Sequence, residues 1–304
     1  MAYLHSDREQ FRDAIDLAYE QTGVMVQAIE KDYYVTMLLR LLAQKMPYIV
    51  FKGGTSLSKC HKVIRRFSED IDITIDTLLS QGQKKKIKQA IVDSAEELGM
   101  TIENLDETRS RRDYNRYVIA YDSVIPMASD ALKAAVLLET SYTAVSFPTV
   151  LLPVHSYIGD MMEQEAPDAI EEYNLNPFEM KVQGIDRTLA DKVFAVCDYY
   201  LQGRVAKHSR NLYDIYKLLP LVPQDENFRE LVKEVRAVRA QLAICPSALP
   251  EANVPELLEK IIKEKAYKQD YDSLTTQLLE ENVPYDTVIA TLKKVAESSI
   301  FENN

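Results

Sequence analysis

The sequence predicts an α/β fold, in which a small mixed β-sheet with flanking helices is followed by an all-helical C-terminal domain. Short apolar runs of β-prone residues occur in the first half of the 304-residue chain and indicate buried strands. In the second half the apolar residues recur at helical spacing. The length suffices for about two domains, which we expect at residues 1–160 and 161–304.

The composition argues against a membrane or secreted protein. Hydrophobic residues make up 46% of the chain and charged residues 27%, as in soluble globular proteins. No apolar run approaches the roughly 18 residues of a membrane span, and the first residues do not resemble a signal peptide. Three widely spaced cysteines favour a reducing compartment. We therefore expect a cytoplasmic protein without membrane association.

The net charge of −11 argues against binding of nucleic acid over a broad surface, because such surfaces are usually basic. The charge is unevenly distributed, however, and basic clusters occur along the chain. A basic groove within an acidic protein therefore stays open as an alternative.

Two helices are expected before the first strand. Ser6 and Glu9 have the spacing of a capping box, which predicts a helix with Ser6 as its N-cap. A second helix is predicted from Val26 to Lys45, with one buried apolar stripe. The charged residues Glu30–Asp32 inside it are interpreted as a solvated turn of this helix.

A strand, a glycine turn and a helix follow. Tyr48–Phe51 is a short apolar run, and Gly53-Gly54 allows a sharp turn and the close approach of a ligand. A helix from Thr55 to Lys62 would direct its free N–H groups toward an anion. The spacing matches neither a Walker A loop nor a Rossmann fingerprint. In isolation, a glycine pair is more often a simple turn.

The next strand carries two aspartates on one face. Side chains alternate along a strand, so Ile71, Ile73 and Ile75 point into a core. Asp70 and Asp72 then point the other way, about 7 Å apart at the backbone, and can converge on a hard cation such as Mg²⁺. A surface Asp-x-Asp pair is usually only solvated. A phosphate-binding turn followed by such a pair, however, is typical of a nucleotidyl-transfer site.

A helix from Gln83 to Leu98 and a short strand from Thr101 to Leu105 are predicted next. The basic stretch that follows interleaves arginine with tyrosine, which suits contacts with phosphates and bases. Its candidate residues for nucleic-acid binding are Arg109, Arg111, Arg112 and Arg116. A hairpin tip with ordinary surface charge is the alternative.

Further strands are expected at Val118–Tyr121 and Ala134–Thr140. Glu139 closes the apolar run of the second one, and a carboxylate in that position is unusual unless it has a partner. In the second half, helices are predicted from Gly184 to Tyr200 and from Arg210 to Leu219. The remaining residues read as amphipathic helices interrupted by prolines.

Four segments resemble one family. Gly-Gly-Thr-Ser-Leu-Ser-Lys at 53–59 and Arg-Phe-Ser-Glu-Asp-Ile-Asp at 66–72 match two motifs of the AbiEii/AbiGii toxin family almost letter for letter. Arg187–Lys192 and Arg210–Tyr216 are similar to its third and fourth motifs. The resemblance extends over residues 26–220 and leaves the rest of the C-terminal half without a match.

Members of this family are nucleotidyltransferases of the DNA polymerase β superfamily, found in bacterial abortive-infection and type IV toxin–antitoxin systems. The resemblance implies Mg²⁺-dependent transfer of a nucleoside monophosphate from an NTP to an RNA acceptor, such as the 3′ end of tRNA. The expected effect is growth arrest or abortive phage infection. It also implies an antitoxin encoded beside the toxin, which need not contact it.

The resemblance also implies roles for individual residues. The residues expected to hold the NTP are Gly53, Gly54, Thr55, Ser56 and Lys59, and Asp70 with Asp72 is expected to hold the metal. In the superfamily a third metal carboxylate comes from a following strand. Glu139 is the candidate for it, and Asp122 is the alternative.

Lys192 and Asp214 occupy functional positions of the family's later motifs. The resemblance implies that Lys192 reaches the triphosphate from the second domain and that Asp214 positions it or the base. The alternatives are an exposed helix lysine and a surface i,i+4 pair between Arg210 and Asp214.

Two other functions are weighed against RNA modification. The acceptor could be a protein hydroxyl, as in AMPylation, and the net charge of −11 slightly favours this alternative. A non-catalytic nucleotide-binding scaffold is the other alternative. The presence of both Asp70 and Asp72 argues against it, because a site without catalytic function would not need to retain both carboxylates.

Overall fold

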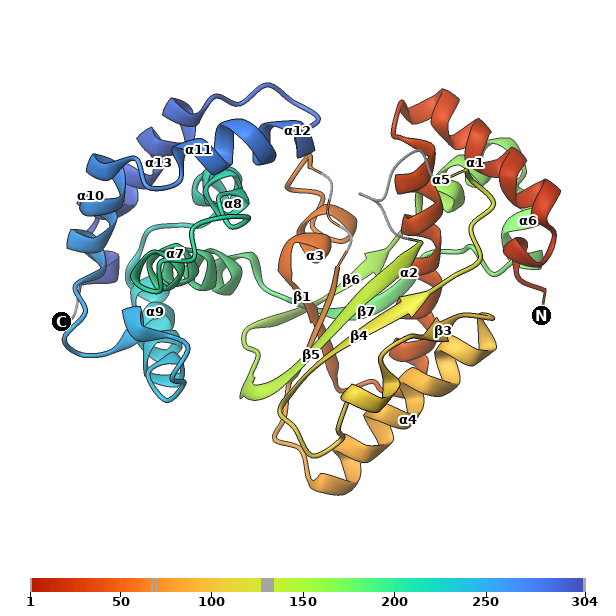
Figure 1. The fold of residues 1–304 in the computed structure, drawn as a ribbon, viewed down its shortest axis with the longest axis horizontal. Helices are drawn as coiled ribbons and strands as arrows, with labels where there is room; N and C mark the ends of the chain where they lie inside the picture. The colour runs from red at the N-terminus through yellow and green to blue at the C-terminus, as the bar shows by residue number, and fades with distance from the viewer. Residues whose placement is uncertain (1, 67, 69, 127–133, 303–304) are drawn as a thin grey trace. The chain divides into compact units, whose positions relative to one another are not determined.

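The computed structural model describes residues 2–66, 68, 70–126 and 134–302, which form two compact units (Figure 1). The first unit comprises Met1–Cys60 and Ser68–Val182, and the second comprises His61–Phe67 and Gln183–Asn304. The second unit contains nineteen acidic and nineteen basic residues, so the whole net charge of −11 belongs to the first.

The first unit combines helices with a mixed sheet. Its helices are α1 (Arg8–Thr22), α2 (Val26–Lys45), α3 (Gly53–Lys59), α4 (Gln81–Glu97), α5 (Tyr157–Glu165) and α6 (Pro167–Glu172), with the short 3₁₀ turns η1 (Leu4–Ser6) and η2 (Leu105–Glu107). Its strands are β1 (Ile49–Lys52), β2 (Ile71–Ile75), β3 (Thr101–Ile102), β4 (Tyr114–Ala120), β5 (Ala135–Val145), β6 (Thr149–Val154) and β7 (Phe178–Gln183).

The strands are arranged in the order β3-β4-β5-β2-β1-β7-β6. Strand β2 lies at the centre, antiparallel to β1 and parallel to β5. Strand β4 runs antiparallel to both β3 and β5, and β7 runs parallel to β1. The predicted α/β fold with a small mixed sheet is therefore confirmed.

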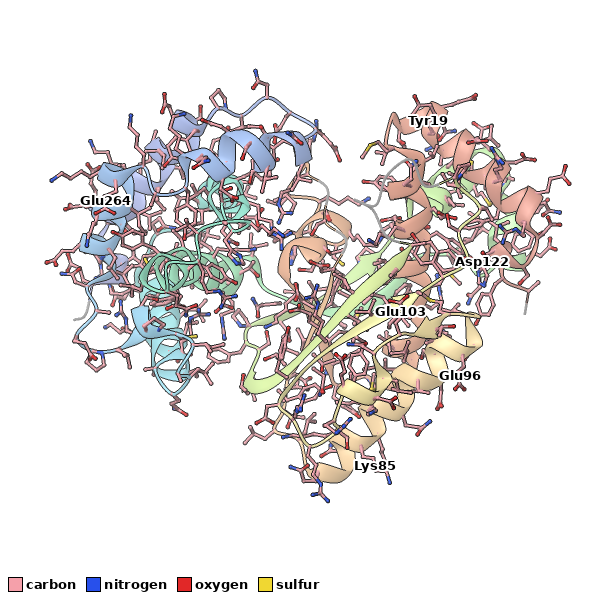
Figure 2. All side chains as sticks on the ribbon, in the orientation of Figure 1. Tyr19, Lys85, Glu96, Glu103, Asp122 and Glu264 are labelled. Atoms are coloured by element: carbon pink, nitrogen blue, oxygen red, sulfur yellow. The ribbon has the colours of Figure 1, made fainter. Side chains whose placement is uncertain are left out.

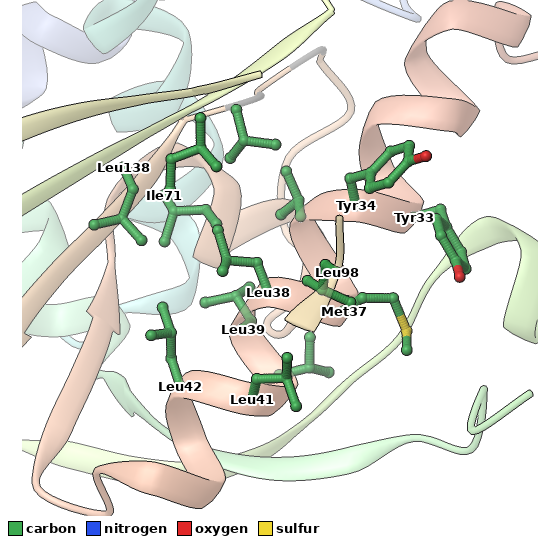
Figure 3. Packing of buried hydrophobic residues seen from close by; sticks show 14 of the residues in the cluster. Tyr33, Tyr34, Met37, Leu38, Leu39, Leu41, Leu42, Ile71, Leu98 and Leu138 are labelled. Atoms are coloured by element: carbon green, nitrogen blue, oxygen red, sulfur yellow. The ribbon is translucent and has the colours of Figure 1, made fainter. Parts of the chain in front are cut away.

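One face of this sheet is covered by helices. Helices α2 and α4 pack against each other, and α2 contacts β5. Leu38 and Leu42 of α2 share one buried cluster with Ile71 of β2 and Leu138 of β5 (Figure 3). Because side chains alternate along a strand, the residues beside these apolar ones face the opposite side of the sheet. The candidate carboxylates lie on that side.

The second unit is helical in its described part. Its helices are α7 (Ile185–Leu201), α8 (Arg210–Leu218), α9 (Glu226–Arg239), α10 (Val254–Glu264), α11 (Lys268–Asp270), α12 (Thr276–Leu278) and α13 (Tyr285–Glu297). Short turns join them: η3 (Leu219–Leu221), η4 (Pro246–Ala248), η6 (Ser299–Phe301) and the π-helical η5 (Tyr271–Thr275). Helix α7 contacts α8, α9 and α10, and its apolar side chains form the centre of the unit.

The segment between α3 and β2 belongs to the second unit by its contacts. The backbone N–H of Arg65 donates to the hydroxyl of Tyr213 on α8, at 3.0 Å. Arg66 forms a single β-bridge with Leu279. The chain therefore leaves the first unit after the glycine turn and returns to it just before the two aspartates.

Two expectations about local structure were wrong. Helix α1 has Asp7 rather than Ser6 as its N-cap, because the Asp7 carboxylate accepts the N–H groups of Glu9 and Gln10, both at 3.1 Å. Asp and Ser are comparable N-caps, so adjacent candidates compete. Strand β7 lies in a region that was expected to be helical, since a six-residue strand gives only a weak signal.

The contacts divide the units at Val182, beyond the expected boundary at residue 160. The reason is that α5 packs on α1 and α2, while β7 joins the sheet next to β1. In the described ranges, every helix is too short or too polar to span a membrane.

The charged turn Glu30–Asp32 of α2 is buried, and its interpretation as a solvated turn was wrong. Glu30 is only 1% exposed, and its carboxylate accepts the hydroxyl of Ser123 at 2.6 Å. Asp32 forms an ion pair with Lys59 of α3 and accepts the backbone N–H of Tyr157 at 3.1 Å. These partners are distant in sequence, so helical spacing alone could not reveal them.

Candidate active site

The glycine turn between β1 and α3 brings the backbone against an aspartate. Gly53 has a φ of +79°, a conformation that other residues rarely adopt. A Cβ atom at this position would lie 2.0 Å from Oδ2 of Asp72. Only glycine therefore allows the Asp72 carboxylate to contact the turn directly. The predicted glycine turn and Asp72 of the predicted aspartate pair thus lie side by side.

Two carboxylates face each other across neighbouring strands. Asp72 of β2 is in register with Glu139 of β5, and registered residues of adjacent strands point to the same face. Asp70 precedes Asp72 by two residues and both are half-buried, whereas Ile71 between them is fully buried. The sequence prediction that two aspartates share one face therefore agrees with the burial pattern.

Cations lie at both ends of this row. Lys52 of β1 is in register with Asp72, and Arg116 of β4 is in register with Glu139. The Nε atom of Arg116 is 3.7 Å from Oε1 of Glu139, and both side chains are partly exposed. The row therefore reads Lys52, Asp72, Glu139, Arg116 across four adjacent strands.

Tyr114 is a site residue that sequence reasoning missed. It lies two residues before Arg116 on β4, so its side chain is on the same face, and it is 52% exposed. Burial and the nearby Glu139 raise the pKa of the Tyr114 hydroxyl to about 12, and Asp72 contributes. The alternation of Tyr114 and Arg116 before a carboxylate-bearing strand was the available signal.

The donors in this row suit a hard cation. Carboxylates directly opposite each other on adjacent strands repel, so Asp72 and Glu139 destabilise the sheet unless a positive charge lies close to them. Mg²⁺ is commonly held by only one or two carboxylates together with water and substrate phosphates. Among the described residues, no group of three or more His, Cys, Asp or Glu side chains is placed to hold a metal ion. An open two-carboxylate site, rather than a protein-enclosed one, fits these residues.

Asp122, the alternative third carboxylate, does not lie in this row. It follows the end of β4, is almost fully exposed and forms an ion pair with Arg8 of α1 (Figure 2). Glu139 is therefore the better candidate on geometric grounds.

The hydroxyl groups of the turn are engaged within the first unit. The Thr55 hydroxyl lies 2.9 Å from the hydroxyl of Ser68. The Ser56 hydroxyl donates to the carbonyl of Gly53 at 2.9 Å, and Ser56 is fully buried. Lys59 is 8% exposed and pairs with Asp32. These contacts lend no support to NTP binding by the side chains of Ser56 and Lys59, which stays a prediction.

The basic stretch after η2 is fixed to α4. Lys88 of α4 donates to the carbonyl of Thr108 at 2.9 Å, and Lys84 pairs with Asp113. Lys85, in contrast, is exposed on the helix surface (Figure 2). The lysines in the first half of α4 therefore differ in role: Lys84 and Lys88 anchor the loop, and Lys85 faces solvent.

The four arginines of this stretch have different surroundings. Arg109 donates to the carbonyl of Thr108 at 2.9 Å, and Arg112 donates to that of Glu107 at 3.1 Å. Arg111 is exposed on the loop, whereas Arg116 lies in the carboxylate row. Their binding of nucleic acid stays a prediction.

Lys192 and Asp214 meet in the second unit. The ammonium of Lys192 lies 2.8 Å from Oδ2 of Asp214 and donates to Oδ1 of Asn211 at 2.9 Å. Arg66 binds the same carboxylate through Nε at 2.7 Å and Nη2 at 2.9 Å. Asp214 is completely buried, so the interpretation as a surface pair with Arg210 was wrong.

The charges of Arg66, Lys192 and Asp214 shift the pKa values of Lys192 and Asp214. Burial would raise the pKa of Asp214, but Arg66 and Lys192 outweigh it and hold that pKa far below its ordinary range. Burial lowers the pKa of Lys192, and the positive charges of Arg66 and Arg210 also lower it, whereas Asp214 acts in the opposite direction. Sequence reasoning missed Arg66, although it lies in the quoted Arg-Phe-Ser-Glu-Asp motif.

The structure therefore groups the predicted residues by unit. In the first unit it brings together Gly53, Asp72 and Glu139, with Asp70 immediately before β2. In the second it brings together Lys192 and Asp214.

A glycine-to-alanine pair tests the close approach at the turn. Gly53→Ala forces a β-carbon into the Asp72 carboxylate and should reduce transfer by about 10²–10³-fold, because Asp72 must move. Gly99→Ala is the matched control, since Gly99 also has a positive φ of +65° but nothing within 4 Å of its Cβ position. Both should lose about 1–2 kcal/mol of unfolding free energy. Equal activity of the two variants, measured beside urea unfolding, would contradict the role of the turn.

Comparison with known proteins agrees with these motifs. The family model described as Nucleotidyl transferase AbiEii toxin, Type IV TA system, matches residues 36–291. A solved structure, MenT4, a nucleotidyltransferase toxin from Mycobacterium tuberculosis H37Rv, is similar at 16% identity with a TM-score of 0.51. That match covers 94% of this chain and 88% of the other, and at this identity it shows the fold alone.

A search of curated proteins gave no match. The family model, however, spans most of the chain and includes the glycine turn, both aspartates and the Lys192–Asp214 pair. The resemblance seen in the motifs is thereby confirmed. The chain belongs to the AbiEii family of nucleotidyltransferase toxins of type IV toxin–antitoxin systems.

Proposed function

We propose that this enzyme transfers a nucleoside monophosphate from an NTP to a hydroxyl of an RNA acceptor, with the 3′ end of tRNA as the first candidate. The observation that carries the proposal is the contact of the Gly53 backbone with the Asp72 carboxylate, next to Glu139. It joins a turn suited to phosphate with an oxygen donor set suited to Mg²⁺.

The residues of the first unit would bind the metal and the triphosphate. Asp72 and Glu139, together with Asp70 as the resemblance implies, would hold Mg²⁺, which would offset the negative charge that develops on the phosphates. Gly53 and Gly54 would let the triphosphate approach the backbone closely. Lys52 and Arg116, at the two ends of the carboxylate row, would limit its negative charge and favour an anionic substrate.

The reaction replaces the phosphoanhydride bond between the α- and β-phosphates with a phosphodiester bond to the acceptor. The oxygen of the acceptor hydroxyl forms a bond to the α-phosphorus, and the bond from that phosphorus to the bridging oxygen of the β-phosphate breaks. Pyrophosphate leaves, and the hydroxyl proton passes to solvent. We assign to Lys192 the role of offsetting charge on the leaving pyrophosphate, with Asp214 as its positioning residue.

The charge distribution bears on the acceptor. All of the net charge of −11 lies in the first unit, and the second is neutral. Binding of a polyanionic RNA would therefore depend on local basic segments, such as the stretch with Arg111 and Arg112, rather than on the overall charge of the protein. A protein acceptor would not need such segments.

One experiment separates these acceptors. The purified enzyme is incubated with Mg²⁺ and each of the four NTPs, labelled at the α-phosphate, in the presence of total tRNA or total protein. We expect label in the tRNA pool. Label in protein alone would favour AMPylation-like activity, and no label with either pool would favour a nucleotide-binding scaffold. Either result would overturn the proposal.

The biological role follows from the chemistry. Modification of the 3′ end of tRNA would block aminoacylation and arrest growth, which in an infected cell gives abortive infection. NTPs and tRNA place this activity in the cytoplasm. The family implies an antitoxin, which we propose is encoded beside the toxin and counteracts it without an obligatory contact.

The exposed arginines offer a test of acceptor binding. Arg111→Ala with Arg112→Ala should raise the KM for the acceptor and flatten its salt dependence, because two phosphate contacts are removed. The KM for the NTP should stay unchanged. Lys263→Ala with Lys294→Ala, two exposed lysines on α10 and α13, is the control with the same change in charge. An equal loss of NTP binding in the arginine variant would place these arginines at the triphosphate instead.

A further inference from the structure

Helices α10 and α13 of the second unit pack against each other and enclose a groove between them (Figure 1). Its volume is about 260 Å³, and it is lined by Glu259, Ile262 and Lys263 of α10 and by Lys293, Ala296 and Glu297 of α13. Ile262 is partly buried and Ala296 is buried, whereas the four charged residues are exposed. The groove therefore has an apolar floor with charged side chains around it.

The two helices of the groove run antiparallel. The guanidinium of Arg236 on α9 donates to the carbonyl of Ala252, just before α10, at 3.5 Å and to that of Phe301, just after α13, at 2.7 Å. At the other end, the ring of Tyr285, the first residue of α13, lies 5.7 Å from the ring of Tyr271 in η5, which follows α10. The beginning of α10 is therefore next to the end of α13.

This packing separates the charges along the groove. Glu259 precedes Lys263 by one turn of α10, and Lys293 precedes Glu297 by one turn of α13. Because the helices run in opposite directions, the two glutamates lie at one end of the groove and the two lysines at the other. The Nζ atom of Lys293 is 3.6 Å from Oε1 of Glu297, but these side chains are 66% and 61% exposed, so the pair contributes little. The groove therefore has an acidic end and a basic end.

Apolar side chains extend the groove beyond its basic end. Ile289 lies one turn before Lys293 on the same face of α13 and is partly exposed, and Ala290 beside it is exposed. Together with Ile262 and Ala296 they form an apolar strip along the two helices. An apolar centre with charged residues around it is the usual composition of a protein–protein contact.

We propose that this groove is the contact surface of a homodimer, in which α10 and α13 pack against the same two helices of a second copy of the chain. The charge pattern is what selects a second copy as the occupant. A uniformly basic or uniformly acidic partner would match one end of the groove and be repelled by the other, whereas an identical groove offers both signs.

The charges also select the symmetry of the dimer. A two-fold axis that lies in the contact plane, perpendicular to the helices, places the acidic end of each groove against the basic end of the other. Glu259 of each copy then faces Lys263 of the other copy, and Lys293 faces Glu297. An axis parallel to the helices would instead bring like charges together, which disfavours that arrangement.

Charge reversal in the full chain tests this surface. Glu259→Lys with Glu297→Lys makes both ends of the groove positive, and Lys263→Glu with Lys293→Glu makes both ends negative. Sedimentation velocity over a range of protein concentrations gives the dissociation constant of the dimer. We expect the wild-type protein to dimerise and each double variant to bind itself at least about tenfold more weakly, because like charges then meet at both ends. A wild-type protein that stays monomeric at the highest concentration reached, or double variants that dimerise as tightly as the wild type, would overturn the proposal.

A mixture of the two double variants distinguishes complementary charge from damage to the fold. The positive groove of one variant matches the negative groove of the other, so an equimolar mixture should form a heterodimer although neither variant dimerises well alone. Thermal unfolding of each variant checks that it is folded. The single substitutions Glu259→Lys and Lys263→Glu repeat the test at one contact, should a double variant fail to fold. Folded variants that form no heterodimer would refute the proposed contact.

A matched control separates position from net charge. Lys260→Glu with Lys294→Glu changes two exposed lysines of the same helices that do not line the groove. It alters the net charge as much as Lys263→Glu with Lys293→Glu, but it should leave the dissociation constant of the dimer unchanged. Added KCl should weaken the wild-type dimer and strengthen self-association of the groove variants, because it screens attraction and repulsion alike. Equal effects of the two lysine variants would show that net charge, not the groove, controls association.

The dimer does not depend on the proposed function. Every residue assigned above to the metal, the NTP or the RNA acceptor lies on elements other than α10 and α13. Labelled-NTP transfer by a protein that stays monomeric would refute the dimer alone. A dimer with the expected response to charge reversal, but without transfer activity, would support the contact surface and refute the proposed function.

Discussion

Asp70→Asn and Asp72→Asn should each reduce nucleotidyl transfer by at least about 10³-fold while leaving the fold intact. An amide is a poor ligand for Mg²⁺ in place of a carboxylate, because it lacks the negative charge that the hard cation prefers. Asp72 also faces Glu139 in register, so its neutralisation removes a repulsion within the sheet. We therefore expect the unfolding free energy to change by less than about 0.5 kcal/mol or to rise slightly.

The control for this pair lies at the other end of the same strand. Asp76 directly follows β2 and pairs with Lys181, away from the glycine turn. Asp76→Asn should retain transfer. Transfer rates of the three variants are measured in Mg²⁺ beside thermal unfolding. Wild-type transfer by Asp70→Asn or Asp72→Asn would refute the assignment of that residue as a metal ligand.

Lys192→Ala should reduce kcat/KM for the NTP by about 10²–10³-fold, which corresponds to roughly 3–4 kcal/mol of transition-state stabilisation. Lys192→Arg should recover only part, because the planar guanidinium cannot replace a compact ammonium between Asp214 and Asn211. Asp214 retains two hydrogen bonds from Arg66 in the alanine variant. The unfolding free energy should therefore fall by less than the loss of about 3–5 kcal/mol that is expected when a buried charge is left unpaired.

Lys217→Ala is the matched control for Lys192. Lys217 lies on the adjacent helix α8 and pairs with Glu281 at 2.9 Å, but its side chain is more exposed. Its removal should change kcat/KM by less than about twofold, since surface ion pairs contribute 0–1 kcal/mol to stability and none to the reaction. The kinetics of Lys192→Ala are measured beside its thermal unfolding. An unchanged kcat/KM would show that Lys192 has a structural role only and takes no part in transfer.

The elements that sequence reasoning located best are those with strong local patterns. Helix α2 was expected from Val26 to Lys45 and has these bounds, because a long periodic stripe of apolar residues determines it. Strand β2 with Asp72 was equally clear, since three alternating isoleucines define its buried face. Strand β7 is short and lacks such a pattern.

The contacts of charged residues could not be predicted in the same way. Local spacing alone is compatible with a surface position for Glu30 and for Asp214, yet both are buried. Their partners Ser123 and Arg66 are 93 and 148 residues away in sequence. Whether a charge is buried depends on such distant partners, and local spacing carries no information about them. The register of Glu139 with Asp72 was likewise accessible only from strand pairing.

The position of the label in the product tests the central claim most directly. The enzyme is given an NTP labelled either at the α-phosphate or at the γ-phosphate, together with tRNA, and the product is compared with that of Asp72→Asn. Nucleotidyl transfer predicts that only the α-label enters the tRNA, that γ-label appears in pyrophosphate, and that Asp72→Asn gives neither. Entry of the γ-label into the acceptor, or α-label transfer that persists in Asp72→Asn, would contradict the account.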